Sequence, residues 1–283
     1  GMAVSSLKMK KKGEGQVSSF QALMNTISST VGMGNIAGVA IALCVGGPGA
    51  IFWMWVSALL GMATKFFEGT LAIMYKGKDD KGVIQGGPMF VLTEGLGRKM
   101  KPLAVMFAFC ALFSGLPVMQ ANQLSESLYS VILEPLGVPE SRWVFLMLGL
   151  VIGGIVSLVI FGGIKRISQV SSRIVPFMVG FYFLMVLGIM IVYHDRLPAV
   201  FDAIFKGAFC WKAGFGALAA VALTGARRAM FVNEAGVGTA GMMHGASMNA
   251  EPVREGLVAM LGPAIDSGLV CTLSAIPMIM AGL

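Results

Sequence analysis

The chain has 283 residues, of which 56% are hydrophobic and only 12% are charged. Soluble domains carry about 25% charged residues, so this composition excludes a disordered chain, a secreted disulfide scaffold and almost any cytosolic enzyme. The 38 glycines and 22 methionines add small-residue packing and soft apolar volume. We therefore expect an integral membrane protein.

Charge-free runs predict the membrane helices, since a span needs ~20 apolar residues. Residues 15–64 contain no charge, and GGPG at 46–49 predicts a turn between two spans. The remaining candidates are residues 103–125, 143–164, 174–193, a broken stretch at 207–249, and 256–283. None shows the alternation of a barrel strand. The predicted fold class is therefore all-α, a polytopic bundle of seven spans.

Lys and Arg fall mainly on one side of these spans. With a cytoplasmic N-terminus, 14 of the 21 basic residues lie in cytoplasmic segments and 4 in external ones. Cytoplasmic loops normally carry this excess. We expect a multi-pass protein of the cell membrane, with a basic cytoplasmic segment at 1–17 and a transmembrane domain at 18–283. The net charge of +7 then faces anionic lipid of the bilayer rather than nucleic acid.

Two of the predicted spans are interrupted by glycines. The first contains VGMGN at 31–35 and the other NEAGVG at 233–238. Backbone that leaves the helix inside a bilayer survives only where it lines a cavity or is buried in protein. A pair of such spans indicates a transporter site, where half-helix ends offer N–H groups to an anion and carbonyls to a cation. Close helix packing at small residues is the alternative.

Several motifs resemble the alanine/glycine:cation symporter family. They are VGMGNIAGVA at 31–40, GGPGAIFW at 46–53, GMATKF at 61–66 with Glu68, GGPM at 86–89, QAN at 120–122, NEAG at 233–236 and VREGLVAM at 253–260. The resemblance implies a transporter, not an enzyme, that imports alanine or glycine. Sodium or a proton would be the coupling ion, and no cofactor is implied.

The same resemblance implies the leucine-transporter fold, in which two inverted five-helix repeats place their broken first helices around the substrate. Residues 18–194 would form the first repeat and residues 207–283 part of the second. Members of the family are longer than this chain. We therefore expect a partial sequence that lacks the C-terminal core helices and does not transport by itself.

The resemblance also gives roles to polar groups near the first break. Asn35 would coordinate sodium through its side-chain oxygen, with Thr30 as a backbone ligand. Ser28 and Val31 would donate carbonyls to a second ion site, and Asp266 in the last span would neutralise the cation. Oxygen ligands of this kind suit sodium. The alternative for Asn35 is a residue that only ties the broken backbone to a neighbouring helix.

The implied substrate site uses both breaks and the third span. Its residues would be Met33, Gly34, Gln120, Phe231, Asn233 and Gly236. The backbone N–H groups of Met33 and Gly34 would bind the substrate carboxylate, Gln120 its amino group, and Phe231 would cover it. The family usually has a small hydroxylated residue where Met33 stands, which affects substrate specificity.

Other charged residues have two readings each. Lys65 and Glu68 are spaced i, i+3, which favours a local ion pair over a role in transport. Arg227 and Arg228 precede the second break, either as an outer gate or as structural side chains that reach toward water.

Two further hypotheses compete with the transporter. A membrane-embedded enzyme would use Glu234, Asp266 and His244, which would then converge within hydrogen-bond reach. An inactive remnant of a transporter would bind no substrate.

Overall fold

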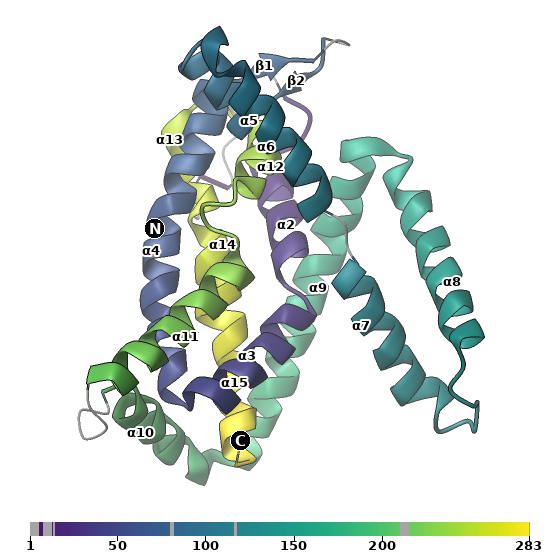
Figure 1. The fold of residues 1–283 in the computed structure, drawn as a ribbon, viewed down its shortest axis with the longest axis vertical. Coiled ribbons are helices and arrows are strands. Elements are labelled where there is room, and N and C mark those ends of the chain that lie inside the picture. Colours follow the sequence, from purple (N-terminus) through teal and green to yellow (C-terminus); the bar gives the residue numbers. More distant parts are fainter. Residues whose placement is uncertain are drawn as a thin grey trace.

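The computed structural model describes residues 6–7, 13, 15–79, 82–115, 118–209 and 215–282. These residues are mostly helical, as predicted, and Figure 1 shows a main bundle with a helical arm beside it. The described strands are β1 (Gly77–Lys78) and β2 (Ile84–Gln85), which form a small antiparallel hairpin at one end of the bundle.

The described part contains five helical stretches long and apolar enough to cross a membrane: α4 (Gly49–Met74), α8 (Arg142–Ile160), α9 (Gly163–Val192), α11 (Phe215–Asn233) and Pro252–Met280. Two shorter helices, α2 (Ser19–Thr30) and α3 (Met33–Gly46), form a bent pair with an angle of 48° and add a sixth span when taken together. The predicted turn at 46–49 therefore separates α3 from α4.

The predicted span at 103–125 is divided between two helices. They are α6 (Lys101–Ser114) and α7 (Val118–Leu128), of 14 and 11 residues. Each is shorter than the ~20 residues that a span needs. α6 packs against α5 (Pro88–Phe90) and η1 (Val91–Gly95), whereas α7 packs against η3 (Tyr129–Leu133) and α8. Figure 1 shows α6 at the end with the hairpin and α7 in the arm.

α4 is the central helix of the bundle. It packs against α11, α10 (Leu197–Ala208), α12 (Thr239–Gly245) and α13 (Pro252–Ala259). Ile51 and Met54 of α4 are fully buried in the main apolar core. The contact with α11 needs glycine, because a Cβ on Gly225 would come within 2.3 Å of the Ala50 carbonyl oxygen. Small residues thus let the two backbones approach closely.

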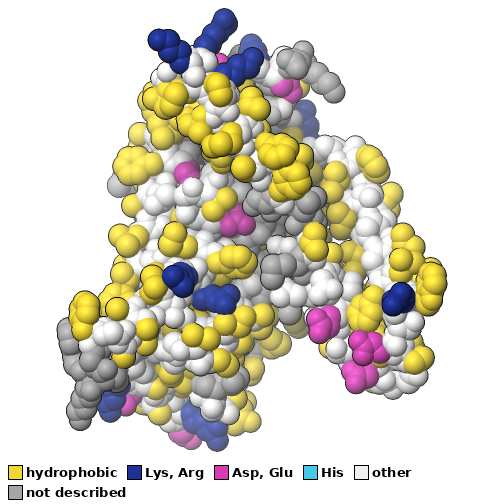
Figure 2. All heavy atoms as spheres, viewed as in Figure 1, with side chains coloured by type: hydrophobic (Ala, Val, Ile, Leu, Met, Phe, Trp, Pro, Cys, Tyr) yellow, Lys and Arg dark blue, Asp and Glu magenta, His cyan; other side chains and the backbone are white. Residues whose placement is uncertain are grey.

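The arm is apolar on its outside. α8 has no buried residue, and Trp143, Leu150 and Leu158 are among its exposed side chains. Figure 2 shows yellow apolar side chains along the arm and over the sides of the bundle. A soluble protein rarely exposes so much apolar surface, whereas a bilayer covers it.

The last span changes its helical type at a proline. After α13 come α14 (Leu261–Pro263), the π-helix η6 (Ala264–Val270) and α15 (Cys271–Met280). Pro263 has no N–H, so it cannot complete the helical bond to the residue four positions earlier. π-helical turns are rare and occur mostly at functional sites, and Asp266 lies within η6.

The remaining short elements are the 3-10 turns η2 (Arg98–Met100) and η4 (His194–Arg196).

Part of the N-terminal segment lies along the loop after α12. Val17 bridges Ser247, and the N–H groups of Gly13 and Gln16 donate to the carbonyls of Met248 and Ala246. The lysines predicted to make this segment basic, at 8 and 10–12, lie outside the described residues.

Candidate functional site

The first break separates α2 from α3. Thr30 ends α2, and Val31 and Gly32 have extended backbone. The side-chain oxygen of Asn35 accepts the Gly32 N–H at 3.0 Å, which satisfies one backbone donor that the break leaves free. Met33 and Gly34 form the first turn of α3, where N–H groups have no partner within the helix. This is the geometry that anion recognition by a helix N-terminus requires.

The second break follows α11. Glu234, Gly236 and Gly238 have positive φ angles of 51°, 90° and 91°. A left-handed glutamate is unusual, and such conformations concentrate at functional sites. Asn233, which ends α11, accepts the Ala235 N–H at 3.0 Å through its side-chain oxygen. Both predicted breaks are confirmed, and in each an Asn side chain binds the freed backbone.

Asp266 joins the first break to the last span. Its Oδ2 accepts the Thr30 hydroxyl at 2.5 Å, and its backbone carbonyl accepts the Asn35 amide at 3.5 Å. Its Oδ1 is buried without a hydrogen-bond partner. One residue further on, the Ser267 hydroxyl accepts the Asn233 amide at 3.2 Å, so η6 also contacts the second break. An unpartnered buried carboxylate oxygen is a fitting ligand for a cation.

Lys65 and Glu68 do not form the predicted local ion pair. The Lys65 ammonium is completely buried and has no hydrogen-bond partner. Glu68 instead accepts the Gly236 N–H at 2.6 Å through Oε1, so it holds the second break against α4. Lys65 is nonetheless within electrostatic range of Glu68, Glu234 and Asp266. Charged residues in the middle of a membrane span are functional by default, so the positions of Lys65 and Glu68 in the sequence already indicated more than a local ion pair.

Cavities lie beside both breaks. One of ≈ 240 Å³ is lined by Val31, Gly32 and Asn35 together with side chains of α9. Drug-sized ligands occupy about 300–1,000 Å³, so this space suits a smaller molecule. A wider hollow of ≈ 560 Å³ lies between α4 and α11 and is lined by Gly61, Thr64 and Asn233.

Two of the predicted substrate ligands, Gln120 and Phe231, lie elsewhere. Gln120 is exposed on α7 in the arm. Phe231 is 61% exposed and lines a separate hollow with Arg227 and Arg228. The Ser28 hydroxyl donates to the Asn25 carbonyl. The structure therefore joins Thr30, Asn35, Asn233, Gly236 and Asp266 through the breaks, and it does not bring Gln120 or Phe231 to them.

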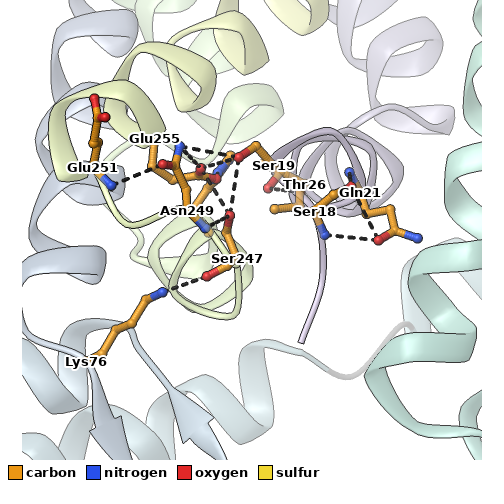
Figure 3. Close-up of polar contacts among 11 residues, drawn as sticks. Ser18, Ser19, Gln21, Thr26, Lys76, Ser247, Asn249, Glu251 and Glu255 are labelled. Atoms are coloured by element: carbon orange, nitrogen blue, oxygen red, sulfur yellow. Dashed lines mark hydrogen bonds and ion pairs between the residues drawn. The ribbon is translucent and has the colours of Figure 1, made fainter. Parts of the chain in front are cut away.

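A second polar cluster lies near the N-terminal end of α2 (Figure 3). The buried Glu255 accepts Ser19 at 2.7 Å, Ser247 at 3.1 Å and Asn249 at 3.1 Å. His244 Nδ1 lies 2.7 Å from the other carboxylate oxygen of Glu255. The Lys76 ammonium donates to the Ser247 carbonyl at 2.6 Å. This cluster was not predicted from the sequence, because Ser19 and Lys76 are far from residues 244–255 in the chain.

The convergence required by the enzyme hypothesis is not seen. Asp266 binds Thr30, Glu234 binds Thr239 and His244 binds Glu255. In the described residues, no group of three or more His, Cys, Asp or Glu side chains is placed to hold a metal ion.

Comparison with known sequences identifies the family. The profile described as the Sodium:alanine symporter family matches residues 1–283. The chain belongs to the sodium:alanine symporter family. This confirms the family resemblance predicted from the sequence, and the apolar helices make this family member a multi-pass membrane protein.

Three relatives illustrate the range of the family. The sodium/alanine symporter AgcS of Methanococcus maripaludis is 42% identical over 276 residues, 95% of this chain and 59% of AgcS. The putative sodium/proton-dependent alanine carrier protein YrbD of Bacillus subtilis is 42% identical over 278 residues, 96% of this chain and 55% of YrbD. The probable sodium/glutamine symporter GlnT of Bacillus subtilis is 35% identical over 269 residues, 93% of this chain and 54% of GlnT. The chain thus spans little more than half the length of these relatives.

Proposed function

We propose that this protein carries out symport of alanine or glycine with sodium across the cell membrane. One observation carries the proposal: Asp266 is a buried carboxylate with an unpartnered oxygen, hydrogen-bonded to the end of a broken membrane helix. A cation at Asp266 neutralises a charge that is costly to bury alone. Thr30 and Asn35 lie beside it and supply oxygen ligands. Ser28 and Val31 belong to a second, neighbouring ion site.

The substrate lies between the two breaks in this proposal. The Met33 and Gly34 N–H groups bind its carboxylate, while Asn233 and Gly236 border it from the second break. Sodium and a carboxylate at adjacent positions attract each other, so each increases the affinity for the other, and this reciprocity is the basis of coupling. Gln120 and Phe231 join the site only after α7 and the exposed face of α11 move toward the breaks, which alternating access provides.

The leucine-transporter-like fold is also part of the proposal. Residues 18–194 and 207–283 are inverted repeats of a leucine-transporter-like fold, the second of them partial. The supporting observation is that each begins with a broken helix followed by a long one, α4 or Pro252–Met280. The N-terminus is cytoplasmic in this proposal. Lys76, which belongs to a predicted cytoplasmic segment, binds the same loop at 246–248 as residues 13, 16 and 17 do.

Binding of labelled alanine to the purified chain in detergent tests this function. We expect saturable binding in sodium that is lost in choline and displaced by glycine. D266N should abolish the sodium dependence while the protein stays folded. Glutamine serves as a competing substrate, because the relative GlnT is named for it. Alanine binding that ignores sodium, or equal binding by D266N, contradicts the proposal.

A further inference from the structure

Lys65 is a fully buried cation that the proposed transport chemistry does not use. It lies in α4, its side chain is 0% exposed and its ammonium has no hydrogen-bond partner. A buried ammonium without hydrogen bonds is costly unless nearby opposite charge compensates it. The compensating groups are Glu68 on its own helix, Glu234 in the second break and Asp266 in η6.

These three carboxylates differ in what else binds them. Glu68 accepts the Gly236 N–H, and Glu234 accepts the Thr239 hydroxyl. Asp266 accepts Thr30 through Oδ2 and leaves Oδ1 without a partner. Glu68 Oε2 is likewise buried without a partner, but Glu68 lies on the same helix as Lys65. Asp266 instead lies beside Thr30 and Asn35 at the first break, where the proposed cation binds. α4 packs directly against η6, and Lys65 interacts electrostatically with Asp266.

We propose that Lys65 is a specificity-determining residue that restricts the Asp266 cation site to monovalent ions. This inference rests on the proposed sodium site. A fixed positive charge repels every cation that approaches Asp266, and the repulsion grows in proportion to the charge of that cation. A divalent ion therefore loses twice as much binding free energy as sodium does. Lys65 weakens sodium binding enough to permit release and weakens calcium binding to the point of exclusion.

The charge ratio makes the inference quantitative. Replacing Lys65 by the similarly sized, neutral Met removes the repulsion. If sodium affinity rises about tenfold, calcium affinity should rise about a hundredfold, because a doubled free energy squares the fold-change. A variant that only loosens the fold would weaken both ions. An increase in affinity that is larger for the divalent ion is therefore specific to the electrostatic role.

The experiment measures sodium and calcium binding to the purified chain in detergent, each by its stabilisation against thermal unfolding. The variants are K65M, K65R, which keeps the charge, and K206M, which removes a surface lysine paired with the exposed Asp202. We expect K65M to bind both ions more tightly, with the greater gain for calcium, and K65R and K206M to behave like the parent chain. Should K65M fail to fold, K65Q makes the same comparison.

The outcomes separate the two proposals. Weaker or unchanged sodium and calcium binding in K65M, or an equal gain for both ions, overturns the role of Lys65. If the parent chain binds no sodium, or if D266N binds it equally well, the proposed sodium site itself fails. Sodium binding that depends on Asp266 but not on Lys65 rejects the inference alone.

Discussion

The Thr30 hydroxyl donates to the Asp266 carboxylate at 2.5 Å, although the two residues are 236 positions apart in the sequence. Thr30 is the last residue of α2, and Asp266 lies in the π-helical turn of the last span. Both side chains are buried. The contact therefore ties the point where one helix breaks to the point where another changes its helical type. Any movement that separates these helices has to break it.

Replacing Thr30 tests how much this contact stabilises the fold. T30V removes the donor and leaves the Asp266 carboxylate buried with fewer partners, whereas T30S keeps the hydroxyl. We expect T30V to lower the free energy of unfolding by about 1–3 kcal/mol and T30S to change it little. Thermal unfolding in detergent without sodium measures both. Equal stability of the two variants would show that the hydroxyl bond contributes nothing.

The glycines of the second break differ in what surrounds them. Gly236 and Gly238 both have φ near the left-handed region, at 90° and 91°. A Cβ on Gly236 would meet only Thr64 at 3.9 Å, whereas one on Gly238 would lie 2.4 Å from Pro88 and 3.1 Å from Phe107. G236A should therefore cost about 1–2 kcal/mol from backbone strain. G238A should cost more, because a clash is added.

The difference between the two alanine variants is the decisive quantity. Unfolding midpoints in the same detergent compare them directly. If G236A destabilises the protein as much as G238A, the space around the break is not what the structure shows.

Asn35 can act as a sodium ligand or only as a structural tie to the broken backbone, and one variant distinguishes these two roles. N35A removes the acceptor for the Gly32 N–H, which should cost about 0.5–2 kcal/mol of stability, as the loss of a helix cap does. If Asn35 is also a sodium ligand, sodium affinity should fall about tenfold or more. If Asn35 only ties the backbone, sodium affinity stays unchanged. N122A, on the exposed face of α7, is the control.

Local signals in the sequence were sufficient to predict both helix breaks. Glycine and asparagine that cluster within an apolar run weaken a helix, and the structure places the breaks at 31–32 and 234–238. The division of the span at 103–125 also had a local signal in Pro117, which lacks a helix donor. The prediction of one span at 103–125 rested on its apolar, charge-free run and did not use this signal.

Partners that are distant in the sequence could not be predicted. The spacing of Lys65 and Glu68 favoured a local pair, yet Glu68 binds the Gly236 N–H, 168 residues away. The break frees the Gly236 backbone N–H, and this N–H donates to the Glu68 carboxylate at 2.6 Å. The Glu255 cluster could not be predicted for the same reason: Ser19, which donates to Glu255, lies 236 residues earlier in the chain.

Glu255 should be the principal stabilising residue of the N-terminal end of α2. Its carboxylate accepts Ser19, Ser247 and Asn249 and also binds His244 (Figure 3). E255Q replaces one acceptor oxygen by a donor that faces other donors, so about 1–3 kcal/mol of stability should be lost. E251Q is the matched control, because Glu251 pairs with Arg254 near the surface, where such pairs contribute about 1 kcal/mol or less.

The loss should also be visible locally. Ser19 leads directly into the segment at 13–17 that lies along Ala246 and Met248, so E255Q should loosen this segment and increase hydrogen exchange there. Exchange in α8, which packs against α7 and α9, should stay the same. If E255Q and E251Q exchange alike at 13–19, the carboxylate does not hold the N-terminal segment, and the backbone bonds to residues 246–248 are sufficient for its position.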